Sequence, residues 1–370
     1  MKRLRIRIVG GSLAGLFAGI LLQRDGHDVK IYERSPSGLA GRGAGLVGQH
    51  DLFRILRAIG CEHVARVGVV AKERIYFDRD GSVAETLLAP QMQISWDFLY
   101  ATVASHMTAE SYLIGQPIIG VVEGSEGAQL LFADGRREDA DLIIGADGLG
   151  SVVRPLLNED ASNRFAGYVA WRGLISETAL PPEAAILMDR FAFYVTSGIH
   201  VLGYLVPGPN GETGFGQRRY NWVWYRPVAS GELQTLFTSA DGRIFDYSLP
   251  RGALSEERLQ MLRSDAASML PPPLVKAIEA EPLPSIQGIF DFEATNIVSA
   301  HTAIIGDAAF VVRPHTAMGV SKAAGDTLAL REALLASEDL SDALERYQKE
   351  RLPVGKSIAD YGRRLGASAL

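Results

Sequence analysis

The first 34 residues combine two patterns of apolar positions. Residues 4–9 (LRIRIV) alternate apolar and charged side chains, as a half-buried strand does, and residues 13–24 have the spacing of a buried helix. Residues 27–34 (HDVKIYER) supply a second strand. A strand, a helix and a strand over this length predict the βαβ start of a nucleotide-binding fold.

The middle of the chain is richer in strand patterns. Helical spacing at 51–59 and 97–109 encloses short strand-like stretches between 73 and 98. Between 113 and 145, strands separated by Gly and Asp turns predict a β-meander. Residues 165–250 then alternate apolar and polar positions and hold most of the Trp and Tyr residues, which predicts an antiparallel sheet.

The last third returns to helical patterns. A helical stretch near 255–280 and a Pro-rich link (271–273, then EPLPS) precede a strand at 301–310 (HTAIIGDAAF). Two further helices are expected at 319–336 and 340–365.

This order predicts an α/β chain, α+β overall, with a Rossmann-like dinucleotide-binding domain and a C-terminal helical segment. The chain leaves the dinucleotide-binding domain to form an inserted antiparallel β-sheet domain and then returns to it. The inserted domain is expected to hold the substrate. The predicted parts are dinucleotide-binding domain 1–72, inserted strands 73–96, dinucleotide-binding domain 97–164, inserted substrate domain 165–283, and dinucleotide-binding domain with C-terminal helices 284–370.

Composition narrows the function classes. The chain has 370 residues, 47% of them hydrophobic, which is enough for a sizeable core, and a formal charge of −6 without long runs of one sign, which argues against a nucleic-acid partner. A lone cysteine, Cys61, fits a reducing compartment, so a cytoplasmic protein is expected. The apolar stretch ending at Leu22 is too short and glycine-rich for an integral membrane segment. No histidine and carboxylate spacing predicts a metal site.

A glycine-rich motif follows the first strand. In Gly10-Gly11-Ser12-Leu13-Ala14-Gly15 the glycines permit a tight turn and let the backbone approach a pyrophosphate at the start of the next helix. Glu33 ends the second strand, where a carboxylate accepts hydrogen bonds from ribose hydroxyls, and Arg34 comes directly after it. This motif alone does not distinguish FAD from NAD.

Two later motifs contain an aspartate after an apolar run. The first is DLIIGADG at 141–148, followed by Ser151, Val153 and Arg154. The second is Gly306-Asp307-Ala308-Ala309, followed by Pro314, Gly319 and Asp326. Asp307 ends a buried strand, so we expect its carboxylate at the edge of the sheet where ligands of open α/β sheets bind. The segment 317–320 then starts a helix whose free N–H groups can face an electron-rich ring.

Together the three motifs resemble the class A flavoprotein aromatic monooxygenases, the para-hydroxybenzoate hydroxylase-like family, over essentially the whole chain. The phrases GGS at 10–12, GAGLV at 43–47, AGYVAWRG at 166–173 and RPHTAMGVSKAAGD at 313–326 are similar to the 2,6-dihydroxypyridine 3-monooxygenase branch. The resemblance implies bound FAD, NADH or NADPH and O2 as co-substrates, and hydroxylation of a phenol or hydroxypyridine through a flavin C4a-hydroperoxide. The residues expected to bind FAD are Gly10, Gly11, Ser12, Leu13, Gly15, Glu33, Arg34, Gly45, Leu46, Val47, Asp147, Asp307, Ala317, Gly319 and Val320.

The chain departs from the family pattern at three places. Phe310 stands where many members have His, and Ser321 stands where Asn is common. Trp96-Asp97 occupies the place of an Arg at the start of a helix, a pair that the pyridine branch shares. The departure leaves that arginine's FAD contact unassigned.

The catalytic residues are expected in the inserted sheet and the loop after Asp307. His315 lies in that loop and is the first candidate proton acceptor, because a histidine can titrate near neutrality; the alternative is a residue that caps the next helix. Tyr204 and Tyr225 are further candidates. Strand alternation allows at most half of the sheet aromatics to face one pocket. These aromatics are Tyr168, Trp171, Phe193, Tyr194, Tyr204, Trp222, Trp224 and Tyr225.

Other functions stay open at this point. The segment 222–227 (WVWYRP) is similar to a phrase of flavin-dependent halogenases. A flavin reductase, an NAD-dependent dehydrogenase or a nucleotide-bound interaction module are further alternatives. The expected partner is a small aromatic substrate, and a homodimer is left open.

Overall fold

The computed structural model describes residues 2–39, 41 and 43–369. Its N-terminal layer is a parallel sheet in the order β19-β12-β1-β2-β8. Ile6, Ile8 and Ile144 on its strands are fully buried, as expected where both faces of a parallel sheet are covered. The strands are β1 (Arg5–Val9), β2 (Asp28–Glu33), β8 (Tyr112–Ile114), β12 (Leu142–Gly145) and β19 (Thr302–Ile304).

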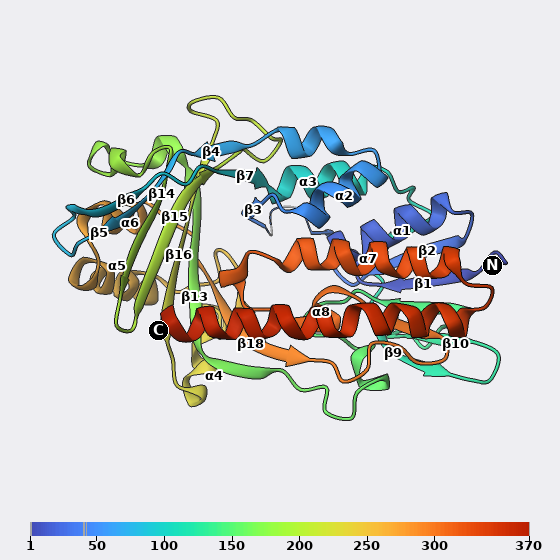
Figure 1. Ribbon diagram of the computed structural model, residues 1–370. Coiled ribbons are helices and arrows are strands. Elements are labelled where there is room, and N and C mark those ends of the chain that lie inside the picture. The colour runs from blue at the N-terminus through green and yellow to red at the C-terminus, as the bar shows by residue number, and fades with distance from the viewer. Residues whose placement is uncertain (1, 40, 42, 370) are drawn as a thin grey trace.

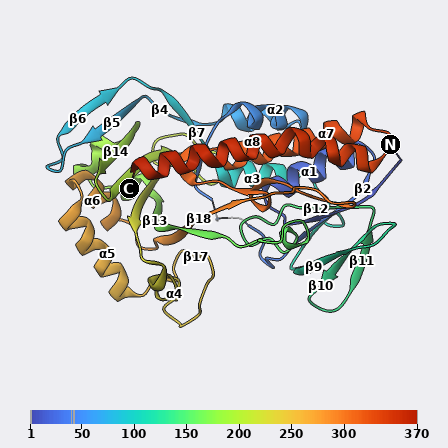
Figure 2. The same cartoon turned by 60° about the horizontal axis from the view of Figure 1, so that its bottom comes forward.

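Helices cover one face of this parallel sheet and a β-meander covers the other (Figure 2). The helix α7 packs against α1, α2 and α8, and α3 packs against α1. The helices are α1 (Leu13–Arg24), α2 (His50–Ala58), α3 (Trp96–Ala104), α7 (Gly319–Ala336) and α8 (Leu340–Ala369). The antiparallel meander consists of β9 (Ile118–Glu123), β10 (Ala128–Phe132) and β11 (Arg137–Ala140).

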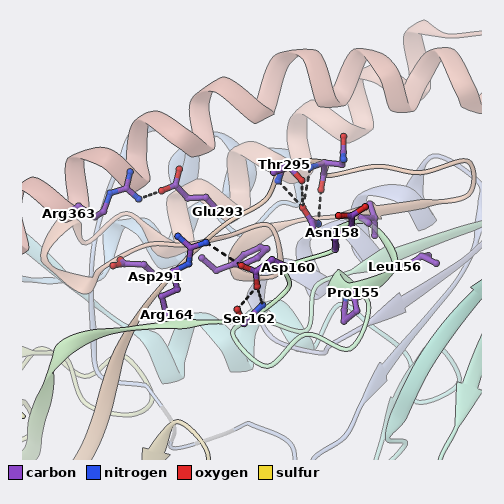
Figure 3. A pocket seen from close by; sticks show the side chains of 14 residues that line it. Pro155, Leu156, Asn158, Asp160, Ser162, Arg164, Asp291, Glu293, Thr295 and Arg363 are labelled. Carbon is purple, nitrogen blue, oxygen red and sulfur yellow. Dashed lines mark hydrogen bonds and ion pairs between the residues drawn. The ribbon is translucent and has the colours of Figure 1, made fainter. Parts of the chain in front are cut away.

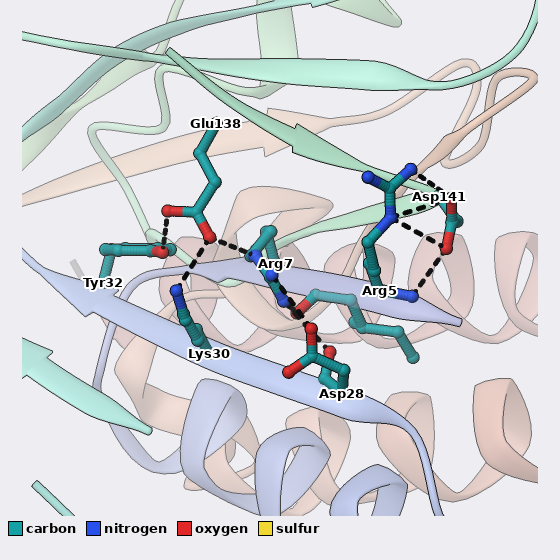
Figure 4. A network of polar contacts seen from close by, with 8 residues as sticks. Arg5, Arg7, Asp28, Lys30, Tyr32, Glu138 and Asp141 are labelled. Atoms are coloured by element: carbon teal, nitrogen blue, oxygen red, sulfur yellow. Dashed lines mark hydrogen bonds and ion pairs between the residues drawn. The ribbon is translucent and has the colours of Figure 1, made fainter. Parts of the chain in front are cut away.

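A polar network joins the meander to β1 and β2 (Figure 4). Glu138 of β11 accepts hydrogen bonds from Arg7, at 2.5 Å, from Lys30 and from the Tyr32 hydroxyl. Burial raises the pKa of Tyr32, and the hydrogen bond to Glu138 adds to the rise. At the amino end of β1, Arg5 forms an ion pair with Asp141. These charges are therefore neutralised among themselves.

A large antiparallel sheet forms the second layer. Its order is β17-β18-β13-β16-β15-β14-β5-β6, with β20 paired to β18 and β14–β5 as a parallel pair. Its strands are β5 (Glu73–Phe77), β6 (Val83–Leu87), β13 (Arg164–Ser176), β14 (Arg190–Thr196), β15 (Ile199–Val206), β16 (Arg219–Pro227), β17 (Ser248–Leu249), β18 (Ser285–Glu293) and β20 (Phe310–Val311).

One face of the large sheet forms a second hydrophobic core. Trp171, Trp222 and Trp224 pack there against residues of α5 and α6 such as Leu262 and Leu274. These helices are α5 (Glu256–Met269) and α6 (Pro272–Glu279), and a short helix α4 (Leu233–Leu236) lies nearby. A smaller sheet, β3-β7-β4, connects this layer to the helices; its strands are β3 (Gly45–Val47), β4 (Val69–Ala71) and β7 (Gln91–Ser95).

The long helix α8 runs beside α7 and reaches from the parallel sheet to the large sheet, so the two chain ends lie at opposite ends of the molecule (Figure 1). Near its C-terminal end, Gly366 touches Tyr168: a Cβ built on this glycine would lie 2.7 Å from the tyrosine hydroxyl. Within the described chain, no helix combines the length and apolar character needed to cross a membrane.

The predicted fold class is confirmed, and four details of the prediction are wrong. The helix expected at 97–109 ends at Ala104. The stretch 271–273 is no link, because Pro272 opens α6, where the missing N–H of proline costs nothing. The strand expected at 301–310 is interrupted after Ile304 by a short turn, Gly306–Ala308. The prediction also omitted β18, which pairs with β13 although it lies beyond the predicted 283/284 domain boundary.

Candidate active site

The three sequence motifs meet at one edge of the parallel sheet. Asp307 follows β19, Asp147 follows β12, Gly10 follows β1 and Glu33 ends β2, and these four strands are neighbours in that order. All four run parallel, so their carboxyl ends lie side by side. Three strand spacings give the edge a length of about 14 Å. We call this line of residues the cofactor edge.

The glycine-rich loop fits tightly against the cofactor edge. Gly10 has φ +103°, and a Cβ added there would lie 2.4 Å from the Ala146 carbonyl oxygen. A Cβ on Gly15 would lie 2.0 Å from the carbonyl oxygen of Gly10. Ser12 precedes the first residue of α1, Leu13, so the first N–H groups of this helix have no partner within it. The loop therefore offers backbone donors to a phosphate, and only glycine fits at Gly10 and Gly15.

Glu33 is buried and oriented by two backbone donors. Its Oε2 accepts a hydrogen bond from the Gly11 N–H at 2.9 Å, and its Oε1 accepts one from the Ser35 N–H at 2.8 Å. The hydroxyl of Tyr112 donates to the Gly11 carbonyl at 2.9 Å. The carboxylate thus stands at the end of β2 with its orientation fixed. Arg34, next to it, is exposed and lines a hollow of about 240 Å³ together with Ser151 and Arg154.

Arg154 connects the second motif to the third. The side chain is 1% exposed, and its guanidinium donates to the carbonyl oxygens of Asp307 at 2.9 Å and Ala308 at 2.9 Å. Asp147 accepts from the Val152 N–H at 2.7 Å through Oδ2, while its Oδ1 is buried without a partner in the part of the chain that the structure describes. Burial raises the pKa of Asp147. Arg154 therefore has a structural role, and Asp147 retains one free acceptor.

The third motif presents both an acid and a helix start. The Asp307 side chain is 46% exposed at the cofactor edge, although protein atoms surround it closely enough that burial raises the pKa of its carboxyl. Ala317 has the left-handed φ of +52°, and α7 begins two residues later at Gly319, followed by Val320. Phe310, in the place of a histidine, is 2% exposed and packs against Gly355 of α8.

The segment at Gly45, Leu46 and Val47 forms β3 and lies against the large sheet. A Cβ on Gly45 would lie 2.9 Å from the ring of Tyr204, so this glycine permits the close approach. The Trp96-Asp97 pair has a local explanation, because Asp97 binds the Arg219 guanidinium at 2.7 Å and the Gly41 N–H at 3.1 Å. The acid thus fixes the loop before β3.

These features fit FAD. The cofactor edge supplies a glycine cradle that a Cβ would fill, a helix start with free N–H groups, a buried acceptor on Asp147 without a partner, and an accessible carboxylate on Asp307. Within residues 2–39, 41 and 43–369, no group of three or more His, Cys, Asp or Glu side chains is arranged to hold a metal ion.

The second part of the site is the face of the large sheet opposite the tryptophans. Tyr168, Ala170 and Arg172 alternate along β13, and Tyr225 and His200 are paired across β16 and β15. We call this surface the site face. It carries half of the predicted aromatics, namely Tyr168, Phe193, Tyr204 and Tyr225, while Trp171, Tyr194, Trp222 and Trp224 belong to the other core.

The loop containing His315 covers the site face. Nε2 of His315 lies 3.0 Å from the Tyr168 hydroxyl, and its ring centroid is 4.1 Å from that of Tyr225 and 5.4 Å from that of His200. Burial, together with the smaller effects of His200, Arg313 and Arg172, lowers the pKa of His315 to about 3. The expectation of titration near neutrality is therefore wrong. His315 is a neutral imidazole at physiological pH.

The sequence prediction missed a set of polar side chains on the site face. Arg172 has a buried Nε without a partner, and within the described chain no carboxylate pairs with its guanidinium. Burial raises the pKa of Tyr204 and of Tyr225, and the charge of Arg172 opposes both increases. Arg172 therefore lies close to all three predicted catalytic residues. The amide of Asn221 and both ring nitrogens of His200 are also buried without partners.

A sizeable cavity lies elsewhere. About 820 Å³ in volume, it lies among the loop before β13, the end of β18 and the end of α8 (Figure 3). Four of its charged side chains form two ion pairs, Arg164 with Asp160 and Arg363 with Glu293, and Asp291 pairs with Arg313. It contains none of the predicted site residues, and volume alone does not indicate the site.

Comparison with known proteins agrees with this geometry. The model of a FAD binding domain family matches residues 3–183, and that of a FAD binding domain-like family matches residues 165–291. The 2,6-dihydroxypyridine 3-monooxygenase of Paenarthrobacter nicotinovorans is 31% identical over 98% of this chain and 91% of its own. The 3-amino-4-hydroxybenzoate 2-monooxygenase of Streptomyces cremeus is 29% identical over 98% of this chain and 87% of its own.

The chain belongs to the class A flavoprotein aromatic monooxygenases, and it binds FAD. Among solved structures, the 2,6-dihydroxypyridine-3-hydroxylase from Arthrobacter nicotinovorans superimposes with a TM-score of 0.92 at 30% identity, over 100% of this chain and 93% of that one. The predicted family and its pyridine branch are therefore confirmed.

Proposed function

We propose that this enzyme uses NADH or NADPH and O2 to hydroxylate a phenol or a hydroxylated pyridine that binds between the site face and the cofactor edge. The observation that carries the proposal is Arg172, a cation in the middle of an aromatic surface with which no acid among the described residues pairs. A partly buried arginine whose Nε is shielded from solvent is stabilised by an anion. An ionised ring hydroxyl supplies one, and ionisation makes the ring more reactive towards an electrophile.

The residues of the site face have different roles in this proposal. When bound, FAD supplies the redox chemistry and the activation of oxygen. The Arg172 guanidinium would hold the ring oxygen, and Tyr204 and Tyr225 would pack around the ring. In the tautomer whose Nε2–H donates to the Tyr168 hydroxyl oxygen, Nδ1 of His315 would accept a hydrogen bond from the ring hydroxyl. With its lowered pKa, His315 acts as a hydrogen-bond acceptor and orienting group and does not take up the proton; the ring hydroxyl would lose its proton to solvent water, and the charge of Arg172 would stabilise the resulting oxyanion.

The cofactor edge has a separate task in this proposal. Gly10, Gly11, Ser12, Leu13 and Gly15 would hold the pyrophosphate, and Glu33 and Arg34 the adenosine. The residues proposed to contact the flavin half are Gly45, Leu46, Val47, Asp147, Asp307, Ala317, Gly319 and Val320. We also propose a cytoplasmic enzyme, because its cysteine is a buried free thiol. A homodimer remains a prediction for sedimentation analysis.

A panel of phenols and hydroxypyridines tests the function. Purified enzyme with FAD is mixed with each ring and with NADH or NADPH, and oxidation of the nicotinamide and hydroxylated product are measured together. At least one ring should stimulate oxidation and give a hydroxylated product. Stimulated oxidation without oxygenated product from any ring would indicate a reductase instead.

A further inference from the structure

Lys322 is a buried cation at the cofactor edge. It lies in the first turn of α7, its side chain is 0% exposed, and its Nζ has no hydrogen-bond partner among the described residues. Two carboxylates are close: Nζ is 4.0 Å from Oδ1 of Asp307 and 3.6 Å from Oδ2 of Asp326. Burying an ammonium is costly unless opposite charges compensate it. The burial of Lys322 therefore needs an explanation.

Asp326 does not explain the burial of Lys322, because other groups already donate hydrogen bonds to both of its carboxylate oxygens. Its Oδ1 accepts a hydrogen bond from Nε of Arg351 at 2.9 Å, and its Oδ2 accepts one from the Gly306 N–H at 3.0 Å. The contact with Arg351, which comes from α8, is also an ion pair. The charge of Asp326 is therefore neutralised without Lys322.

Asp307 is in the opposite situation. Within the described chain, no hydrogen-bond donor reaches its carboxylate, and Arg154 binds only its main-chain carbonyl. Lys322 is the cation beside the carboxylate itself. Burial raises the pKa of Asp307, Lys322 is the strongest opposing influence, Arg154 also lowers this pKa, and Asp326 raises it.

We propose that Lys322 is a positioning residue of the cofactor site, whose ammonium holds the Asp307 carboxylate ionised and turned towards the hydroxyl groups of bound FAD. The proposal rests on Asp307 contacting FAD, as proposed above. Lys322 itself stays behind the aspartate, so it acts through Asp307 and not on the reacting ring.

The test is the affinity of the apoprotein for FAD as a function of pH, followed by quenching of flavin fluorescence. In the wild type, Asp307 stays ionised and the dissociation constant changes little between about pH 8 and pH 6. In Lys322→Met the pKa of Asp307 rises, so FAD binding weakens progressively as pH falls. The loss should reach about tenfold at the acid end, as for removal of one hydrogen bond to a charged group.

Two further variants show whether the effect passes through Asp307. Asp307→Asn has no carboxyl to titrate, so its affinity for FAD should be lower than that of the wild type but independent of pH. Adding Lys322→Met to Asp307→Asn should change the affinity little. Arg331→Met is the matched control, since Arg331 lies on the same helix but pairs with Asp25; its affinity for FAD should equal that of the wild type.

An equal loss of FAD affinity at every pH, no loss, or a full additional loss in the Asp307→Asn background would each overturn the proposal. Lys322→Gln keeps a polar side chain and must show the same slope with pH if Lys322→Met does not fold. The titration requires neither substrate nor turnover. An enzyme that binds FAD as described but hydroxylates no ring would contradict the proposed function and leave the role of Lys322 standing.

Discussion

The cofactor edge and the site face differ in the groups that they offer to a ligand. At the cofactor edge the proposed contacts with FAD come mainly from the main chain. Hydrogen bonds within the protein hold Gly11, Glu33 and Arg154 in place. On the site face, side chains from several strands make the surface, and Arg172 and His200 have polar atoms without partners. The main chain of the first region is therefore held in place by the protein itself, although Oδ1 of Asp147 and Nζ of Lys322 have no partner among the described residues, whereas the second region is completed by its ligand.

This difference predicts different consequences of substitution. A change at the cofactor edge should disturb the fold and the FAD affinity together, because backbone and ligand share the same space. A change on the site face should leave FAD in place and alter the affinity for the ring.

Gly10→Ala should have the largest effect. The positive φ and the contact with the Ala146 carbonyl together should cost at least about 3 kcal/mol of unfolding free energy and abolish FAD binding. Gly26→Ala is the matched control, because Gly26 has φ +92° but no atom within 4 Å of an added Cβ. It should cost only about 1–2 kcal/mol and retain FAD. Equal melting temperatures for the two variants, each measured with FAD in the solution, would contradict the tight fit.

Arg172→Met should weaken binding of the aromatic substrate without changing binding of FAD. The dissociation constant of the aromatic substrate, measured by perturbation of the flavin absorption, should rise about tenfold to hundredfold, with unchanged FAD affinity. Arg226→Met serves as the control, because Arg226 on β16 already has the partner Asp265 at 2.7 Å. This variant should bind the ring as the wild type does. If Arg172→Met bound the aromatic ring with wild-type affinity, the proposal that Arg172 binds an ionised ring hydroxyl would be wrong.

The histidines of the site face should make the protein sensitive to acid. Burial lowers the pKa of His200 to about 4 and that of His315 to about 3, so the unfolded chain binds more protons below the ordinary histidine pKa. Stability is then full above about pH 6.5 and declines as pH falls, by up to about 2 kcal/mol per histidine at pH 5.

Denaturant unfolding at neutral and acid pH measures this decline. His315→Gln should reduce the loss of stability in acid, retain FAD and slow hydroxylation. His50→Gln is the control, since the His50 side chain is 84% exposed, and its loss in acid should match that of the wild type. Unchanged turnover in His315→Gln would exclude the proposed role of His315 towards the ring hydroxyl.

Arg5→Met should have the smallest effect. The Arg5–Asp141 pair lies at the amino end of β1, away from the cofactor edge, and the arginine side chain is half exposed. Loss of an exposed pair should change the unfolding free energy by less than about 1 kcal/mol. FAD titration should show no change; a clear loss of affinity would mean that the cofactor edge is sensitive to charges across the whole sheet.

The same contrast explains how much could be predicted from sequence. The range of α1 and the motifs of the cofactor edge were readable, because a glycine turn, a helix start and an acid are set by short-range spacing. Arg172 was not recognised, since alternation shows that half the residues share a face but not which half meets His315. β18 was missed because its pattern follows Pro-rich residues and it is buried only through pairing with β13, over a hundred residues away.

The most direct test of the account is the source of the oxygen in the product. The enzyme is supplied with FAD, the nicotinamide and the best ring from the panel under isotopically heavy O2, and the product is analysed by mass spectrometry. The account predicts one heavy oxygen atom in each hydroxylated ring, with product formation reduced in Arg172→Met at limiting substrate. Product that carries oxygen from water, or O2 consumption that yields only hydrogen peroxide with every ring, would contradict it.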